Sequence, residues 1–89
     1  MTEKAAGLYK RILGIWDFLY RLETGRKDWL VSKLREDNRF RNAYDAVVIL
    51  TSTALVFIRD GAYDTAEDIV SIAERKAGLL GYKPRKVTG

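Results

Sequence analysis

The sequence contains no cysteine, no histidine and no glutamine, and its only methionine is Met1. Without cysteine there is no disulfide framework and no thiol chemistry. Without histidine the usual imidazole base and the commonest metal ligand are both missing, so any catalysis would rely on carboxylates, lysine, tyrosine or hydroxyl groups. The acidic spacing of a calcium loop and the glycine-rich loop that holds phosphates are also missing. We therefore expect no enzyme activity, no metal site and no cofactor.

Long hydrophobic runs are also scarce. The longest uncharged run, Ala46 to Ile58, is shorter than the roughly 20 residues that span a membrane, and a Thr-Ser-Thr step interrupts it. We interpret it as a buried helix. The N-terminus does not have the pattern of a signal peptide, so a cytoplasmic protein without a membrane partner is expected. The scarcity of thermolabile residues beside 31% charged residues is typical of heat-stable proteins from thermophiles.

The hydrophobic pattern predicts an all-α fold. Of the 89 residues 47% are hydrophobic, enough for one packed domain, and they recur at intervals of three and four without sustained alternation. We predict a small bundle of three long helices, at residues 2–23, 39–59 and 63–80, and one short helix at residues 26–36. The last two helices would form an antiparallel hairpin. Residues 1–82 would form the single domain and residues 83–89 a flexible basic tail.

Several residues have the chemistry of helix ends or helix contacts. Thr2 is a candidate N-cap of the first helix, and Asp37 or Asn38 a candidate N-cap of the third. The first helix is expected to end at Thr24-Gly25, because glycine favours the left-handed conformation common at C-termini. Gly7 and Gly14, one heptad apart, predict the close approach of a neighbouring helix; a kink or a slot for a partner is the alternative.

The segment RDGAYDTAEDIV, residues 59–70, joins the last two predicted helices. With its flanks it resembles a single helical hairpin of the tetratricopeptide-repeat family. The resemblance covers residues 50–80 and rests on Ala54, Phe57, Gly61, Tyr63, Ala66, Val70 and Ala73. Leu50 and Thr53 stand where that family has Trp and Leu. A generic αα-hairpin needs the same residue types, and the chain contains no second copy to build the family's binding groove.

Positive charge is concentrated in two places. Residues 21–41 carry seven basic and four acidic side chains, and residues 83–89 carry three basic ones, whereas residues 42–82 are net acidic. The candidate phosphate-binding residues are Arg26, Lys27, Lys33, Arg35, Arg39 and Arg41, with Lys83, Arg85 and Lys86 as a flexible arm. Phe40 or Tyr82 is expected to stack on unpaired bases. The alternative is a solvated surface balanced by neighbouring carboxylates.

These observations favour a non-enzymatic, small helical binding protein. We expect a subunit of a nucleic-acid-associated assembly that contacts phosphates through a basic helix and tail. The alternative is a protein-only scaffold or adaptor, a homodimer that pairs its first helices through Tyr9, Trp16 and Tyr20. The first helix supports protein contact in either case, because it has more large apolar residues than a core of this size easily buries.

Overall fold

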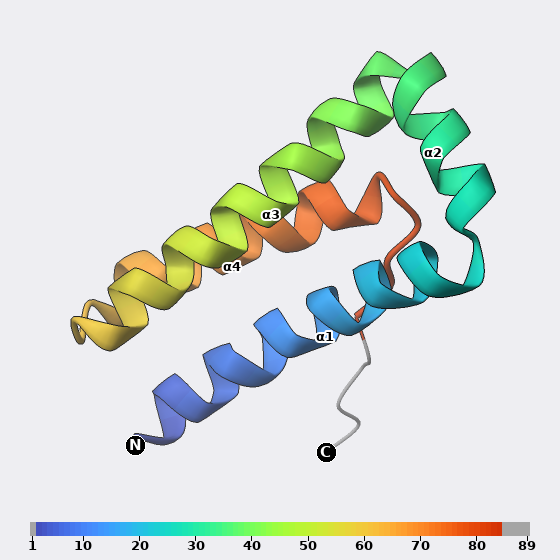
Figure 1. Cartoon of the computed structure of the whole chain (residues 1–89). Helices are drawn as coiled ribbons and strands as arrows, with labels where there is room; N and C mark the ends of the chain where they lie inside the picture. Colours follow the sequence, from blue (N-terminus) through green and yellow to red (C-terminus); the bar gives the residue numbers. More distant parts are fainter. Residues whose placement is uncertain (1, 85–89) are drawn as a thin grey trace.

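The computed structural model describes residues 2–84, which form four α-helices and no strand. The helices are α1 (Glu3–Gly25), α2 (Lys27–Glu36), α3 (Asn38–Arg59) and α4 (Tyr63–Gly78). The predicted all-α fold is therefore confirmed. α3 and α4 lie side by side, α1 passes along them, and α2 forms the corner that links α1 to α3 (Figure 1).

The N-termini of two helices have side-chain caps. The Thr2 hydroxyl accepts a hydrogen bond from the Ala5 N–H at 3.1 Å, and the Asp37 carboxylate accepts one from the Phe40 N–H at 3.1 Å. Asp37, and not Asn38, is thus the cap of α3. α1 ends at Gly25, as predicted, but the expected left-handed conformation was wrong: Gly25 is helical, and the chain leaves the helix at Arg26, where φ is −138°.

α3 and α4 pack closely because small residues line their contact. Ala54 on α3 and Ala66, Ala73 and Ala77 on α4 are all fully buried, which lets the two backbones approach. The connecting turn uses Gly61 at φ 79°, a conformation that favours glycine. The residues that carry the tetratricopeptide-repeat resemblance therefore have a local structural role in closing this hairpin.

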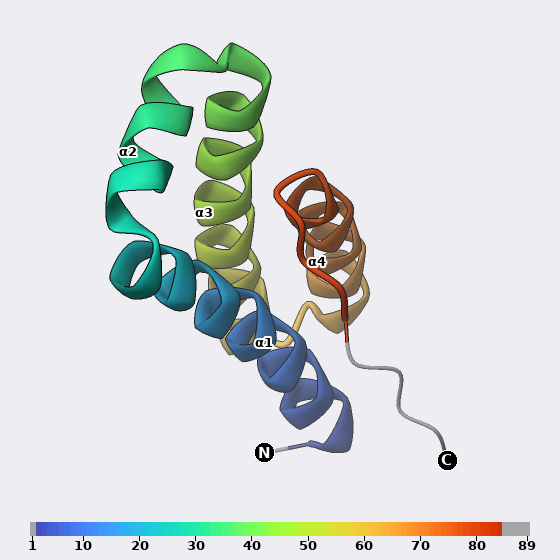
Figure 2. The same cartoon turned by 90° about the vertical axis from the view of Figure 1, so that its right-hand side faces the viewer.

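The core has two parts along the length of α1. One lies near the turn between α3 and α4 and includes Leu8 and Ile12 of α1; the other lies near α2 and includes Ile15, Leu19 and Leu22. α1 thus completes both parts, and Figure 2 shows it crossing below α3 and α4.

The segment after α4 returns to α1. Gly81, at φ 106°, turns the chain so that Tyr82 packs against Phe18 with ring centroids 5.4 Å apart. A Cβ atom on Gly14 would lie 2.8 Å from the Tyr82 hydroxyl oxygen, whereas one on Gly7 would meet nothing within 4 Å. Gly14 therefore makes room for a side chain, not for the neighbouring helix that was predicted.

Ion pairs join α1 to α4. The Arg11 guanidinium donates two hydrogen bonds to the Glu74 carboxylate, at 2.6 and 3.2 Å, and one to the Ser71 hydroxyl at 3.1 Å. Nearer the N-terminus, Lys4 lies 2.6 Å from Asp64. Glu74 raises the pKa of Arg11 further, chiefly through their hydrogen bond, so the guanidinium stays charged. Acidic residues of α4 thus contact basic residues of α1 within the same chain.

Candidate binding surfaces

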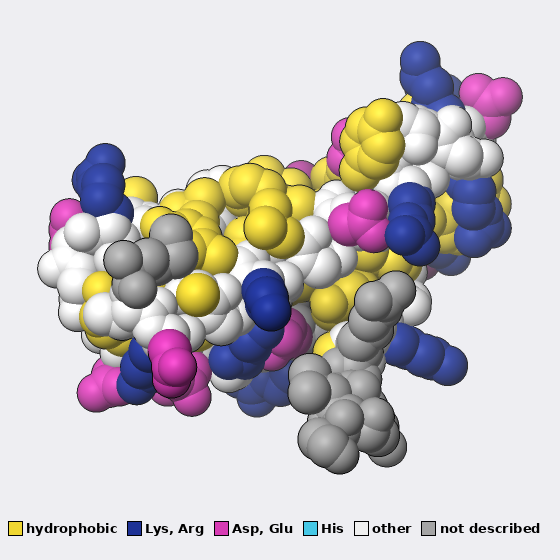
Figure 3. All heavy atoms as spheres, turned by 90° about the horizontal axis from the view of Figure 1, so that it is seen from below, with side chains coloured by type: hydrophobic (Ala, Val, Ile, Leu, Met, Phe, Trp, Pro, Cys, Tyr) yellow, Lys and Arg dark blue, Asp and Glu magenta, His cyan; other side chains and the backbone are white. Residues whose placement is uncertain are grey.

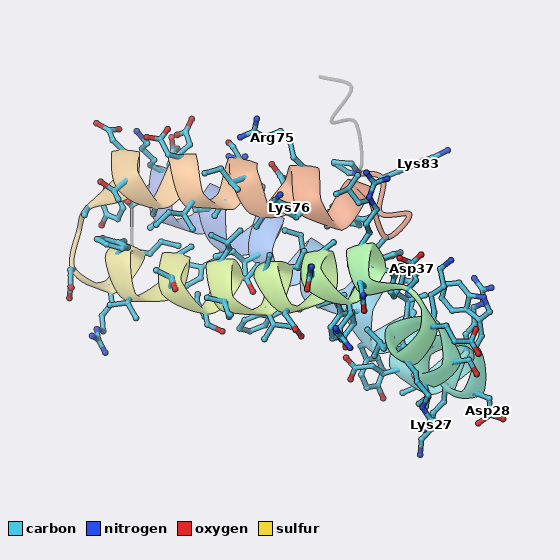
Figure 4. All side chains as sticks on the ribbon, turned by 90° about the horizontal axis from the view of Figure 1, so that it is seen from above. Lys27, Asp28, Asp37, Arg75, Lys76 and Lys83 are labelled. Atoms are coloured by element: carbon cyan, nitrogen blue, oxygen red, sulfur yellow. The ribbon has the colours of Figure 1, made fainter. Side chains whose placement is uncertain are left out.

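A basic groove lies where the start of α3 meets the end of α4. Its volume is about 670 Å³, and Lys33 of α2, Arg39 of α3 and Lys76 of α4 line it. Figure 4 shows Lys76 between α4 and α3, with Asp37 at the start of α3. Three helices therefore place three cations around one open groove.

The one carboxylate in the groove is already engaged. Asp37 caps α3 through the Phe40 N–H and also lies 3.2 Å from the Lys33 ammonium. These two contacts, the backbone hydrogen bond first, lower the pKa of Asp37, so it stays ionised at neutral pH. Arg39 and Lys76 have no salt bridge within residues 2–84, which leaves two cations of the groove for an anionic partner.

The two aromatic residues predicted to stack on bases are each at least half-buried. Phe40 contributes to the groove, but only 7% of it is exposed, and its ring lies perpendicular to that of Trp29 with the centroids 5.6 Å apart. Tyr82 is half-buried against Phe18. Phe40 is therefore too buried to stack on a base, whereas stacking by Tyr82 stays a prediction. Trp29 is more exposed, and the Arg26 guanidinium lies over its ring at 4.1 Å.

The other predicted basic residues that the structure describes do not line the groove. Arg41 donates a hydrogen bond to the Asn38 side chain at 3.0 Å, and Lys27, Arg35 and Lys83 are exposed without lining the groove. Arg85 and Lys86 lie outside the described residues. Of the predicted basic residues within residues 2–84, only Lys33 and Arg39 line the groove.

Sequence reasoning missed Lys76 because it belongs to the segment with net negative charge. Lys76 is in the last turn of α4, which the hairpin places beside the first turns of α3 and therefore beside Arg39. The signal was the hairpin itself: in an αα-hairpin the end of the second helix lies near the start of the first.

An apolar face on α1 and α3 is the second candidate surface. Its large side chains are 38–64% exposed: Leu13, Trp16 and Tyr20 on α1, and Val48, Ile49 and Val56 on α3. Hydrophobic side chains gather as a band along the molecule in Figure 3. Of the predicted interface residues, Trp16 and Tyr20 belong to this face, whereas Tyr9 is half-buried against the core near the α3–α4 turn. Leu13 was not predicted.

Trp16 is held in place by a buried hydroxyl. Its indole N–H donates a hydrogen bond to the Thr51 oxygen at 2.8 Å, and the Thr51 hydroxyl in turn donates to the Val47 carbonyl at 2.8 Å. Thr51 is fully buried, so this pair satisfies its polar atom and also fixes the indole at the seam between α1 and α3. The large ring on this face therefore has a defined orientation.

α3 was predicted to be buried, and this is only partly correct. It contacts the other three helices, yet only 28% of its most apolar window is buried. By length and composition α3 is the one helix in residues 2–84 that could cross a membrane, a property it shares with core helices of soluble proteins. Within the same residues, no group of three or more His, Cys, Asp or Glu side chains could hold a metal ion.

No protein-family model, curated protein or solved structure matches this chain. Its function is therefore inferred from the basic groove and the apolar face.

Proposed function

We propose that this chain is a non-enzymatic helical binding protein that contacts the phosphate backbone of a nucleic acid through the basic groove. The observation that carries the proposal is the convergence of Lys33, Arg39 and Lys76 from three different helices on one groove. Cations that converge on a concave surface can contact successive phosphates, whereas a solvated basic helix has no such arrangement.

The bundle suits this role. We infer three long helices and one short one, with the antiparallel α3–α4 hairpin as a rigid support for the groove. The short α2 adds Lys33 to one wall, and exposed Lys27, Arg35 and Lys83 extend the positive potential around the groove. Binding would then depend on charge and backbone geometry and not on base sequence, since the three cations of the groove come from three different helices and not from one reading helix.

Fluorescence anisotropy with labelled single-stranded and double-stranded oligonucleotides of DNA and RNA tests the proposal. With about three phosphate contacts, log Kd should change with log salt concentration with a slope of about 2 to 3 in magnitude. The double substitution Arg39→Gln/Lys76→Gln should weaken binding at least tenfold at low salt and reduce that slope by about 2.

A matched control removes the same charge elsewhere. Arg21 and Arg59 are exposed and do not line the groove, so Arg21→Gln/Arg59→Gln should leave the salt slope unchanged. Equal losses in the two double variants would show that net charge and not the groove determines binding. Absence of binding to every oligonucleotide at about 20 mM salt would overturn the proposal, because screening is weakest there.

A further inference from the structure

One side of α1 has a stripe of large apolar residues whose spacing is the same in both directions; Leu13, Trp16 and Tyr20 are exposed and Tyr9 is half-buried. Tyr9, Leu13, Trp16 and Tyr20 follow one another at spacings of four, three and four residues. This spacing places them on one side of the helix. The stripe has a large aromatic residue at each end, and its centre lies between residues 14 and 15. A second α1 in the opposite direction would therefore meet it in register.

The exposed residues on the outer face of α3 also have a spacing that is the same in both directions along the helix. Val48, Ser52 and Val56 are exposed and lie four residues apart, so they form one row with the small Ser52 at its centre. A second α3 in the opposite direction would pair Val48 with Val56 at both ends of the row. Ser52 would lie at the midpoint, where a small residue allows two helices to approach closely.

The two centres lie close together along the molecule. The hydrogen bond from the Trp16 indole to the Thr51 hydroxyl, 2.8 Å long, holds these two residues on facing turns of α1 and α3. α1 and α3 run in opposite directions (Figure 1), so the point just before Trp16 is level with the point just after Thr51. The centre of the α1 stripe and Ser52 therefore fit a single two-fold axis, which is the requirement for an interface between identical chains.

We propose that this apolar face binds a second copy of the chain, with the two-fold axis at Ser52 and α1 antiparallel to α1 of the other copy. Leu13 of each copy contacts Trp16 of the other, and Tyr9 contacts Tyr20. The arrangement adds a second layer of helices to the α1–α3 face and leaves the basic groove, on the α3–α4 side, open in both copies.

Charged residues beside the stripe would meet residues of opposite charge in the other copy when the same two-fold axis relates the two. Lys10 and Asp17 both lie on the flank of α1 away from its buried side, and antiparallel pairing brings Lys10 of each copy near Asp17 of the other. At present Asp17 lies 3.0 Å from Arg21, with both side chains mostly exposed. Opposite charges on one flank favour the antiparallel arrangement, whereas the parallel one would place like charges together.

The area available is sufficient for a dimer. The six large side chains of the face are 38–64% exposed. At full areas of about 200 Å² each, they present about 600 Å² per copy, at the upper end for a monomer's largest apolar patch. Two copies would bury about 1,200 Å² together, which is the lower limit for a specific interface.

Sedimentation or light scattering at about 100 µM protein gives the first test, because interfaces near this size reach micromolar affinity. The expected mass is twice 10.2 kDa. Ser52→Glu places two carboxylates at the axis and should give a monomer with an unchanged helical circular dichroism spectrum. Thr65→Glu, on the exposed side of α4, is the matched control and should stay dimeric. A monomeric native chain, or a Ser52→Glu dimer, would overturn the proposal.

The orientation has its own test. Lys10→Glu should weaken the dimer several-fold, and Lys10→Glu/Asp17→Lys should restore it, since the pair is re-formed with exchanged signs.

Because the chain has no cysteine, Ser52→Cys alone should yield a disulfide-linked dimer under mild oxidation, and Thr65→Cys should not. Failure of the charge exchange to restore the dimer, or equal cross-linking at both positions, would contradict the antiparallel arrangement. Flotation of a monomer with lipid vesicles would instead assign the face to a membrane.

Discussion

The two sides of α1 differ in how completely this chain covers them. Towards α4, Lys4 and Arg11 have carboxylate partners, and Tyr82 occupies the space above Gly14. Towards the outer face of α3, Trp16 makes one hydrogen bond at the seam, and Leu13 and Tyr20 remain 59 and 64% exposed. Within residues 2–84, other parts of the chain complement one side, whereas the other side is apolar and exposed.

This difference separates residues that maintain the fold from residues available for binding. On the α4 side a lost contact leaves a partner unsatisfied, so substitutions should cost stability. On the outer side, removing an exposed apolar group costs little in a monomer, because its surface is already in water. A residue's position around α1 therefore predicts whether its substitution affects unfolding or association.

The largest expected difference is between two neighbouring apolar residues of α1. Ile15 is fully buried and Leu13 is 59% exposed. Ile15→Ala should lower the free energy of unfolding by about 2–5 kcal/mol through lost burial and a cavity. Leu13→Ala should change it by less than about 0.5 kcal/mol in dilute, monomeric protein. Urea titration at low micromolar concentration measures both. Comparable losses would mean that the stripe belongs to the core of the single chain.

A smaller effect should come from Gly14 and Tyr82. Replacing a helical glycine with alanine gains about 1 kcal/mol in helix propensity. At Gly14 the new Cβ would press on the Tyr82 hydroxyl, 2.8 Å away, so this gain should be offset. In a Tyr82→Phe background the obstruction is gone, and Gly14→Ala should stabilise the protein by about 1 kcal/mol. A double-mutant cycle by urea unfolding measures this coupling.

Gly7→Ala is the control for that cycle, because nothing lies within 4 Å of its Cβ position. It should stabilise the protein by about 1 kcal/mol whether residue 82 is Tyr or Phe. If Gly14→Ala were as stabilising as Gly7→Ala in the native background, Tyr82 would not be held over α1 in solution. The α4 side of α1 would then be less closed than the structure indicates.

The helices could be predicted from the sequence to within two residues at each end, because apolar spacing, Asp37 and Asp60-Gly61 are local signals. The conformation at the end of α1 was mispredicted, because Gly25 has the chemistry of a left-handed helix end but stays helical. Tyr82 could not be placed, since its position depends on the turn at Gly81 and on the space above Gly14, which lie far apart in the sequence.

The candidate surfaces were predictable only in part, because they also combine residues that lie far apart in the sequence. Lys33 and Arg39 belong to a basic segment, but Lys76 comes from an acidic one, and only the pairing of α3 with α4 places it beside them. Likewise, the aromatic residues of α1 indicated an apolar surface. Its extent over α3 depends on which side of α3 contacts α4, and hydrophobic periodicity alone does not determine this.

The smallest expected effect is the pH dependence that Lys4 and Asp64 add on the α4 side. The hydrogen bond from Lys4 lowers the pKa of Asp64 in the folded protein. The unfolded value is about 3.9. The pair therefore stabilises the fold above about pH 4, and this contribution is lost as the pH falls through the folded pKa. Asp64→Asn should lower Tm slightly at pH 7, with a difference from wild type that shrinks towards pH 2 and in 1 M NaCl.

Asp68→Asn, at an exposed carboxylate of α4 with no salt bridge in residues 2–84, is the control. If both variants shifted Tm equally at every pH and salt concentration, the net charge of α4, and not its contact with α1, would be the cause.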